Sequence, residues 1–309
     1  MKNISLSILL LFSTFIFSQE IISEELNLKN KEVQLPGILS YLKSKQKSPL
    51  VIFVHGSGNV DRNGNQAGTT VNANYIKILA DSLNTKGIAF YRYDKRSATP
   101  DNRKFLKNIT IKDFVDDLHI AVNHFKNDKR FSGIHLVGHS QGSLVAMLSI
   151  TGLIKSYTSL AGAGQSIDKT IIAQITSQSP PLGKIAEAHI SELMQTDTIK
   201  TVNPMLLSLF APQNQKFLKN WITIDPQKEI QKITIPTLII NGDADLQVMV
   251  ADAEKLKAAK PEAKLVIIPK MNHVLKTVNS LEENQQSYAK KEFPLSKLLI
   301  HTISEFVKQ

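Results

Sequence analysis

Residues 138–142 read GHSQG, a serine between two glycines at the spacing GxSxG. The apolar run 134–137 precedes this motif, and the helix-compatible segment 143–150 follows it. A strand, a tight turn and a helix in this order form a nucleophile elbow, in which the serine hydroxyl stands clear at the carboxyl end of a strand. The two glycines let the backbone bend sharply and keep side chains away from the serine. The motif therefore predicts Ser140 as a nucleophile.

Cleavage of an acyl bond by serine also needs a base to take its proton and a carboxylate to orient that base. His273 lies in a loop after the apolar run 265–268, late in the chain, and is the predicted base. Two carboxylates, Asp243 and Asp245, follow the apolar run 235–240. We predict Asp245 as the orienting acid, with Asp243 as the alternative.

The same chemistry needs amide donors for the oxyanion that develops on the substrate carbonyl. One predicted donor is the backbone N–H of Gln141, at the start of the helix after the nucleophile. The other is the backbone N–H of Ser57, which follows the apolar run 50–54. Gly56 and Gly58 flank Ser57 and allow the backbone to approach a substrate closely.

These residues lie at the ends of apolar segments that alternate with helical ones. Such alternation predicts a mostly parallel central sheet with helices on both faces. The alternation stops at about 163–225, a stretch too long for a plain connection, and we expect a helical cap insertion there. Near the start, 33–41 predicts an edge hairpin that turns at Pro36-Gly37. The predicted strands of the parallel sheet are 50–54, 88–93, 134–137, 157–160, 235–241 and 265–268.

Several of these motifs together resemble a known group of proteins. The sequence is similar to the α/β-hydrolase superfamily, and within it to the serine aminopeptidase S33-like and bacterial carboxylesterase group. The resemblance implies an α/β-hydrolase fold over nearly all of 19–309 and the chain order Ser140, Asp245, His273. It departs at Ser97, where relatives usually have glycine. The matching segments are 55–58 (HGSG), 61–65 (DRNGN), 93–96 (YDKR), 138–142, 241–248 (NGDADLQV) and 271–273 (MNH).

Composition excludes several other classes of protein. The chain of 309 residues has no cysteine, so disulfides, a thiol nucleophile and cysteine-ligated zinc are excluded. No histidine and carboxylate cluster has metal-ligand spacing and no glycine loop suits a nucleotide, so no metal and no cofactor are expected. The net charge is +10, but the lysines are scattered and no basic run is interleaved with aromatics. We therefore expect no nucleic-acid partner.

The amino terminus has the pattern of a signal peptide. Residues 1–18 combine Lys2 with an apolar stretch, 4–17, and the small residue Ser18 just before Gln19. The apolar stretch is shorter than the ~20 residues that a transmembrane helix needs. We expect cleavage near Ser18/Gln19 and export, with no stable membrane insertion afterwards; an uncleaved anchor is the alternative.

Other titratable residues have mainly structural interpretations. His301 is a rival base because it too lies late in the chain, but it is expected in solvent on the last helix. Asp168 is an alternative acid. Asp94 is expected to support the loop of His55, with Arg96 as its charge partner. The remaining histidines, expected in structural or surface positions, are His119, His124, His135, His139 and His189.

Three functions follow from these residues. The first is an exported serine hydrolase that acts on small carboxylic esters. The second keeps the same residues but acts on short peptides as an S33-type aminopeptidase, with Glu187 and Glu192 as the carboxylates that could hold the substrate ammonium. The third is a non-catalytic binding protein on the same scaffold, which would normally lack one of the three predicted catalytic residues. The sequence does not indicate the acyl group, the alcohol or the oligomeric state.

Overall fold

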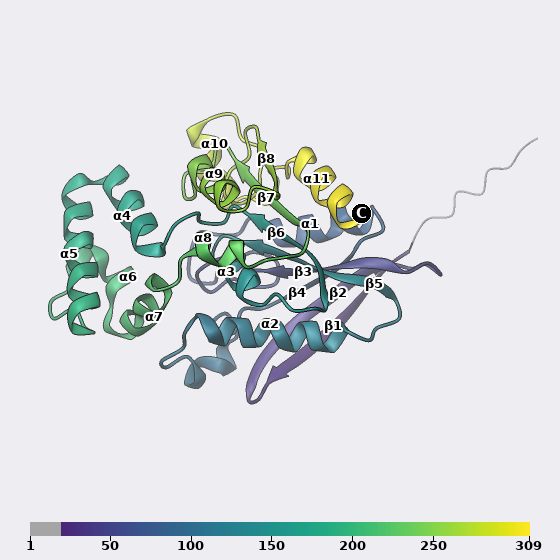
Figure 1. Ribbon diagram of the computed structural model, residues 1–309, viewed down its shortest axis with the longest axis horizontal. Coiled ribbons are helices and arrows are strands. Elements are labelled where there is room, and N and C mark those ends of the chain that lie inside the picture. Colours follow the sequence, from purple (N-terminus) through teal and green to yellow (C-terminus); the bar gives the residue numbers. More distant parts are fainter. Residues whose placement is uncertain (1–19) are drawn as a thin grey trace, which may run out of the picture.

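The computed structural model describes residues 20–309, so the predicted signal peptide lies outside the described residues (Figure 1). One sheet contains the strands β1 (Ile21–Asn30), β2 (Val33–Leu42), β3 (Ser48–Val54), β4 (Ala89–Tyr93), β5 (Phe131–His139), β6 (Ile154–Leu160), β7 (Thr237–Gly242) and β8 (Lys264–Ile268). Their order in the sheet is β1-β2-β4-β3-β5-β6-β7-β8. β2 runs antiparallel to β1 and β4, and the other neighbouring pairs are parallel.

Helices cover both faces of this sheet (Figure 1). One face packs against α1 and α11 and the other against α2, α3 and α9, each side with its own apolar cluster. The predicted mostly parallel sheet between helices is thus confirmed. In the part of the chain that the structure describes, no helix has the length and apolar character to cross a membrane. The helices that precede β6 or follow β7 are α1 (Tyr75–Asn84), η1 (Pro100–Phe105), α2 (Ile111–Phe125), α3 (Gln141–Leu148), α9 (Val250–Ala259), α10 (Leu281–Ser287) and α11 (Lys297–Val307).

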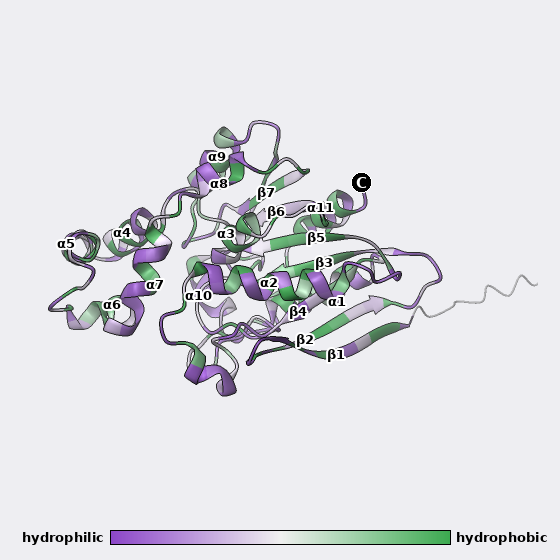
Figure 2. Ribbon diagram, turned by 60° about the horizontal axis from the view of Figure 1, so that its bottom comes forward, coloured by the Kyte–Doolittle hydropathy of each residue, from purple (hydrophilic) through white to green (hydrophobic). Residues whose placement is uncertain are grey.

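The central strands are buried along their length because both faces of the sheet are covered. In β3 the side chains from Leu50 to Val54 are at most 3% exposed. Figure 2 shows hydrophobic residues along the inner strands and polar residues on the outer sides of the helices. A continuous apolar run, in place of an alternating one, is what a strand of a covered parallel sheet requires.

The edge of the sheet differs from the prediction. The sequence pattern predicts a turn at Pro36-Gly37, but both residues lie within the single strand β2. The hairpin turn lies earlier, at Lys31, whose φ is 55°, and it joins β1 to β2. The strand tolerates Pro36 because pairing with β4 begins only at Gly37, and the Pro36 carbonyl accepts a hydrogen bond from the Asp94 N–H at 2.7 Å.

The predicted insertion leaves the sheet after β6. It contains α4 (Ile167–Gln178), α5 (Pro180–Thr196), η2 (Pro204–Leu206), α6 (Leu207–Phe210) and α7 (Pro212–Ile222), and α8 (Pro226–Gln231) leads back to β7. In Figure 1 the helices α4 to α7 form a group at one side of the sheet. Their buried apolar side chains make a third cluster, separate from the two clusters of the sheet: Ile171, Ala186, Ile190, Leu193, Ile199, Leu206, Phe210 and Leu218.

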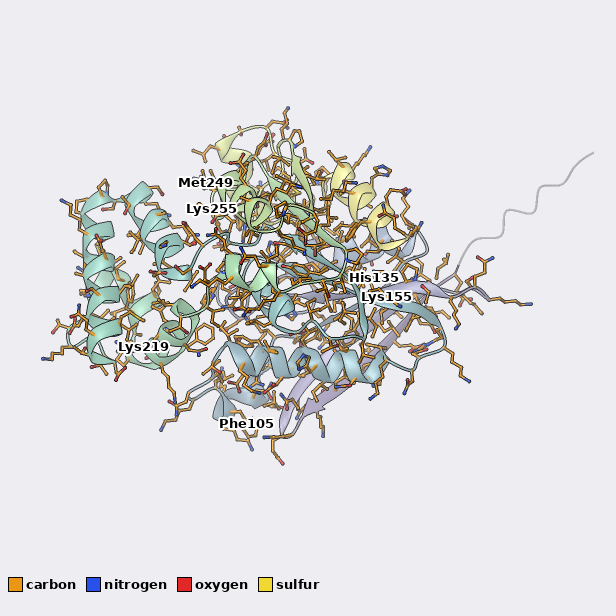
Figure 3. All side chains as sticks on the ribbon, viewed as in Figure 1. Phe105, His135, Lys155, Lys219, Met249 and Lys255 are labelled. Atoms are coloured by element: carbon orange, nitrogen blue, oxygen red, sulfur yellow. The ribbon has the colours of Figure 1, made fainter. Side chains whose placement is uncertain are left out.

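Polar contacts join this insertion to the helix α9 and to the loop after β7. Lys255 of α9 donates a hydrogen bond to the Gln165 side chain, just before α4, at 2.8 Å (Figure 3). Gln174 of α4 donates to the carbonyl of Gln247, in the loop after β7, at 2.6 Å. The insertion is therefore held beside the edge where the predicted site residues end their strands.

Candidate active site

Ser140 occupies the turn between β5 and α3 in a strained backbone conformation. Its φ is 55° and its ψ is −123°, in a region that L-residues rarely adopt. A Cβ atom at Gly142 would overlap the carbonyl of Val54, and one at Gly138 would overlap the carbonyl of Gly142. The two glycines of the motif are thus required by close backbone contacts. The Ser140 N–H donates a hydrogen bond to the carbonyl of Leu160 in β6 at 2.9 Å, which holds the turn against the sheet.

His273 and Asp245 form a buried hydrogen-bonded pair. Nδ1 of His273 lies 2.7 Å from Oδ2 of Asp245, and their side chains are 7% and 0% exposed. The other carboxylate oxygen accepts the N–H groups of Gln247 and Val248 at 2.7 and 2.9 Å. Since a carboxylate can only accept, the ring proton of neutral His273 lies on Nδ1 and leaves the lone pair on Nε2. This is the tautomer that can take a proton from a hydroxyl.

Asp243, the alternative acid, has a different partner. It is exposed, and its Oδ1 accepts the backbone N–H of Lys270 at 2.6 Å. It therefore braces the turn after β8. Of the two predicted carboxylates, the structure brings only Asp245 to His273.

His139 supports the loop that contains His273. Nε2 of His139 donates to the His273 carbonyl at 2.8 Å, and Nδ1 lies 3.3 Å from the Tyr75 hydroxyl. Because a carbonyl can only accept, the remaining ring nitrogen accepts from Tyr75. Burial moves the pKa of His139 well below its ordinary value, so the ring stays neutral. Sequence reasoning gave His139 a structural position but did not identify Tyr75 as its partner.

Two cavities meet at Ser140. One has a volume of about 220 Å³ and contains His273 together with polar groups such as the side chains of Gln66 and Tyr288. The other has a volume of about 160 Å³ and lies under the insertion, where apolar side chains dominate its wall. Within residues 20–309 no hydrogen bond joins Ser140 Oγ to His273, but both side chains line the first cavity. The apolar residues of the second cavity are Leu144, Ala163, Ile167, Ile171, Leu209, Trp221, Ile224, Pro226 and Val248.

The predicted amide donors lie beside the same two cavities. Gln141 is the first residue of α3, where an amide has no carbonyl partner inside the helix. Ser57 lies in the exposed loop after β3 and lines both cavities. Gly58 follows with a φ of 91°, a conformation that glycine adopts without strain.

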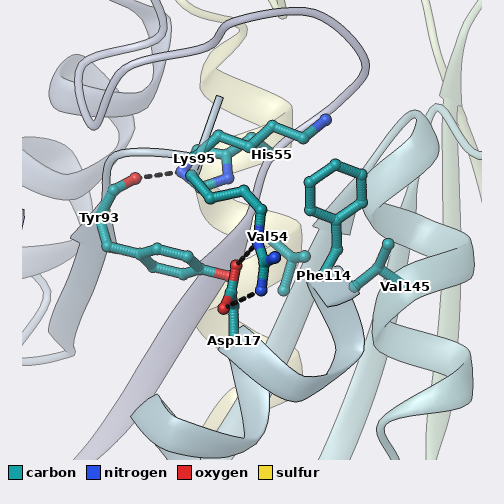
Figure 4. Close-up of a pocket in the computed structure, with 8 residues that line it drawn as sticks. Val54, His55, Tyr93, Lys95, Phe114, Asp117 and Val145 are labelled. Carbon is teal, nitrogen blue, oxygen red and sulfur yellow. Dashed lines mark hydrogen bonds and ion pairs between the residues drawn. The ribbon is translucent and has the colours of Figure 1, made fainter. Parts of the chain in front are cut away.

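His55 holds this loop in place. Its Nε2 contacts the carbonyl of Tyr93, and its ring packs edge-on against the Tyr93 ring with centroids 4.7 Å apart (Figure 4). Burial lowers the pKa of His55 to about 4, so the ring is neutral near pH 7. The contact joins the carboxyl ends of β3 and β4, which gives His55 a structural position.

The predicted ion pair between Asp94 and Arg96 is wrong. Asp94 pairs with Arg62, which reaches its two carboxylate oxygens from Nε and Nη2 at 2.9 and 2.8 Å. Arg96 turns instead to α2 and pairs with Asp117 through Nε and Nη2, both at 2.7 Å. Asp94 and Arg96 lie in the loop after β4, which ends at Tyr93, and each finds its partner on a different neighbouring segment. Sequence proximity does not reveal a partner that comes from a distant loop or helix.

The other candidates lie away from Ser140. His301 lines a groove between α1 and α11, on the far side of the sheet from α3. Asp168 is at the start of α4 but lines neither cavity. Glu187 is exposed, Glu192 is half-buried, and neither lines a cavity at Ser140. Residues 20–309 contain no cluster of side chains able to hold a metal ion.

Comparisons with known proteins identify the family of this chain and a curated relative. A family model described as BD-FAE matches residues 38–259. Esterase EstD of Thermotoga maritima is 27% identical over 248 residues, which cover 78% of this chain and 58% of EstD, so the chain spans less than two thirds of that relative's length.

Solved structures of the same shape include Est1E from Butyrivibrio proteoclasticus and the Pyrococcus furiosus esterase Pf2001. Est1E is 20% identical, with a TM-score of 0.59 and coverage of 92% of this chain and 97% of Est1E. Pf2001 is 19% identical, with a TM-score of 0.57 and coverage of 94% and 91%. These likenesses confirm the predicted fold. The chain therefore belongs to the BD-FAE family and has the α/β-hydrolase fold.

Proposed function

We propose that this protein is a carboxylesterase-type serine hydrolase that forms an acyl-enzyme on Ser140. The observation that carries the proposal is the buried pair of Asp245 and His273, because His273 lines a cavity together with Ser140, which stands at a strained turn. EstD, Est1E and Pf2001 are each described as esterases, which supports the same reaction.

We propose a role for each residue that is consistent with this geometry. His273 takes the Ser140 proton on Nε2 as the serine oxygen attacks the ester carbonyl. The N–H groups of Ser57 and Gln141 bind the oxyanion, and Asp245 stabilises the imidazolium. The intermediate then collapses, the alcohol leaves with the proton from His273, and water repeats the sequence to release the acid.

Each of the two cavities binds a different part of the ester. The leaving alcohol must receive its proton from His273, so the alcohol occupies the polar cavity that His273 lines. The acyl group then occupies the cavity under the insertion, where Leu144, Leu209 and Trp221 offer apolar surface. We therefore propose an apolar acyl group as substrate. A solved complex of Est1E contains ferulic acid, whose aromatic acyl part is of this kind.

An S33-type aminopeptidase remains the alternative, with less support. A free amino terminus needs a carboxylate close to the scissile bond. Among the described residues, neither cavity at Ser140 is lined by aspartate or glutamate. A non-catalytic binding protein is supported still less, because a serine, a histidine and an aspartate are all present at the expected strand ends.

Labelling with a fluorophosphonate probe tests the proposal directly. We expect the parent protein to be labelled and to hydrolyse short p-nitrophenyl esters faster than aminoacyl p-nitroanilides. Ser140→Ala should lose both labelling and turnover, whereas Ser177→Ala, at a hydroxyl on the outer side of α4, should keep both. Undiminished ester turnover by Ser140→Ala would refute the proposed nucleophile, and faster turnover of the anilides would favour the aminopeptidase.

We also propose export with cleavage near Ser18/Gln19. The support is the charged, apolar and small-residue pattern of residues 1–18. The amino-terminal sequence of protein recovered from outside the cytoplasm should begin at or near Gln19. A protein that keeps Met1 and sediments with membranes would point to an uncleaved anchor.

A further inference from the structure

Lys95 is a buried lysine next to the candidate active site. Its side chain extends beside the Phe114 ring, with Nζ 4.4 Å from the ring centroid (Figure 4). Nζ donates hydrogen bonds to the Gly56 carbonyl at 2.8 Å and to the Gln141 side-chain oxygen at 2.6 Å. Within residues 20–309 Lys95 has no carboxylate partner, and the residue is only 6% exposed.

A buried ammonium without a carboxylate is costly. Removal of the ion from water has a large free-energy cost, and two neutral acceptors and one ring offset only part of it. Burial lowers the pKa of Lys95 to about 7, which reflects the same cost. An apolar residue would avoid this cost, which points to a role for the ammonium in holding its two acceptors in place.

The first acceptor of Lys95, the carbonyl of Gly56, determines the direction of one N–H of the proposed oxyanion hole. The carbonyl of Gly56 and the N–H of Ser57 belong to the same peptide group. In a trans peptide these two groups point in opposite directions, so a carbonyl fixed toward Lys95 aims the N–H of Ser57 the other way. A cation on the carbonyl also polarises the peptide group and strengthens its N–H as a donor.

The second acceptor of Lys95 belongs to Gln141, the residue that supplies the other proposed oxyanion donor. The side chain of Gln141 accepts from Nζ, while the backbone N–H of the same residue is the proposed donor at the start of α3. One ammonium thus links the loop after β3 to the turn after β5. These two segments are far apart in the sequence, and the parallel pairing of β3 with β5 brings them together.

We propose that Lys95 is a positioning residue of the oxyanion hole, which holds the Gly56-Ser57 peptide group and Gln141 so that both N–H groups face the carbonyl oxygen of the substrate. This inference rests on the proposed function. Lys95 acts through those two segments and does not itself touch the substrate. Its effect is therefore on the transition state, where the oxyanion exists, and not on binding of the uncharged ester.

The competing explanation is that Lys95 only stabilises the fold. Lys260 provides a control, because it is also a buried lysine, 3% exposed, whose Nζ donates to a backbone carbonyl, that of Ile233, at 2.5 Å. Unlike Lys95, it also pairs with a carboxylate, that of the exposed Glu262, at 2.5 Å. Lys260 lies at the end of α9 and lines neither cavity at Ser140. Lys260→Met should therefore lower stability without a change in the chemistry of the folded protein.

The test compares Lys95→Met, Lys95→Gln and Lys260→Met in the full protein. With p-nitrophenyl acetate, Lys95→Met should lower kcat by about 10- to 100-fold, less than loss of a donor itself, with a change in KM below about threefold. Affinity for a trifluoromethyl ketone, which forms an oxyanion on the serine, should fall by a similar factor. Lys95→Gln keeps one donor and should be intermediate, and Lys260→Met should stay within about threefold of the parent.

Equal kcat values in folded Lys95→Met and parent protein would overturn the inference, as would an equal loss in Lys260→Met. If Lys95→Met does not fold, Gln141→Met removes one acceptor and keeps both the ammonium and the backbone N–H. A kcat unchanged in both Gln141→Met and Lys95→Gln would then overturn it. A parent protein that neither reacts with fluorophosphonate nor turns over esters would refute the proposed function and this inference together. An active parent with a fully active Lys95 variant refutes the inference alone.

Discussion

The ring of His139 donates a hydrogen bond from Nε2 to the backbone carbonyl of His273 at 2.8 Å. One of these residues directly precedes the candidate nucleophile, and the other is the candidate base, 134 residues further along the chain. The contact links the last residue of β5 to the loop after β8. The distance between Ser140 and His273 therefore depends on a third, neutral side chain.

Loss of this contact should impair catalysis more than folding. His139→Leu removes the donor, and a shift of about 1 Å in a catalytic group can cost up to 100-fold in rate, so we expect kcat to fall by about 10- to 100-fold. His139→Gln, which can present an N–H, should recover part of the loss. Steady-state kinetics with thermal unfolding of each variant checks this, and a fully active His139→Leu would show that the loop of His273 needs no such support.

The two carboxylates after β7 should differ sharply in their effect on activity. In Asp245→Asn the amide donates to Nδ1 of His273, which moves the ring proton to Nε2 and blocks proton transfer from serine. We expect kcat to fall by roughly 10³- to 10⁴-fold. Asp243→Asn loses only a charge-assisted bond to the Lys270 N–H, so its kcat should stay within about threefold of the parent value. Comparable losses in both variants would contradict the assignment of Asp245.

A bulky side chain in the cavity under the insertion should shorten the acyl groups that the protein accepts. Leu209 lines this cavity and is 37% exposed, so Leu209→Trp should fill space at little cost in stability. We expect kcat/KM for p-nitrophenyl hexanoate to fall by about tenfold relative to the acetate. Leu207→Trp on the same short helix, outside the cavity, is the control. An unchanged chain-length profile in Leu209→Trp would place the acyl group elsewhere.

Lys95 should make stability depend on pH. Its pKa is about 7 in the folded protein and 10.5 in the ordinary state, so between these values the unfolded chain binds more protons. The free energy of unfolding then rises with pH in this window, and the contribution is lost as pH falls through 7. Between pH 6.5 and 9 the parent should gain roughly 2 to 3 kcal/mol relative to Lys95→Met.

Urea unfolding of both proteins across this range measures the difference. Other groups titrate there too: Lys276, whose pKa burial lowers to about 8, contributes equally to both proteins and cancels. Parallel stability curves would show that the Lys95 ammonium is not destabilised by its surroundings.

The sequence predicted most of the sheet because covered parallel strands are continuous apolar runs, such as 50–54 in β3. Strand ends also predicted where chemistry would gather, and Asp245 and His273 meet there. The turn of the edge hairpin was predicted at the wrong place because Pro36-Gly37 is a common turn pair. Pro36 and Gly37 can instead lie within β2 because β4 pairs with that strand only from Gly37 onward.

Contacts between distant segments were the least predictable part. The partner of Asp94 was misassigned because neighbours in the sequence were preferred over Arg62, which a separate loop supplies. Lys95 lay inside a matching motif, yet its contacts with Gly56 and Gln141 follow only from the pairing of β3 with β4 and β5. Such side-chain partners are fixed by topology, which local patterns leave open.

The insertion has an apolar cluster of its own. It joins the rest of the chain through hydrogen bonds to the loop after β7 and to α9, and through the packing of Phe217 in α7 on Phe114 in α2. A mutation inside that cluster can therefore loosen α4 to α7 while the sheet stays folded. One wall of the cavity under the insertion would then change while Ser140, Asp245 and His273 kept their places. Mutations in the insertion alone can thus change which acyl group is accepted, while the residues that carry out the reaction are retained.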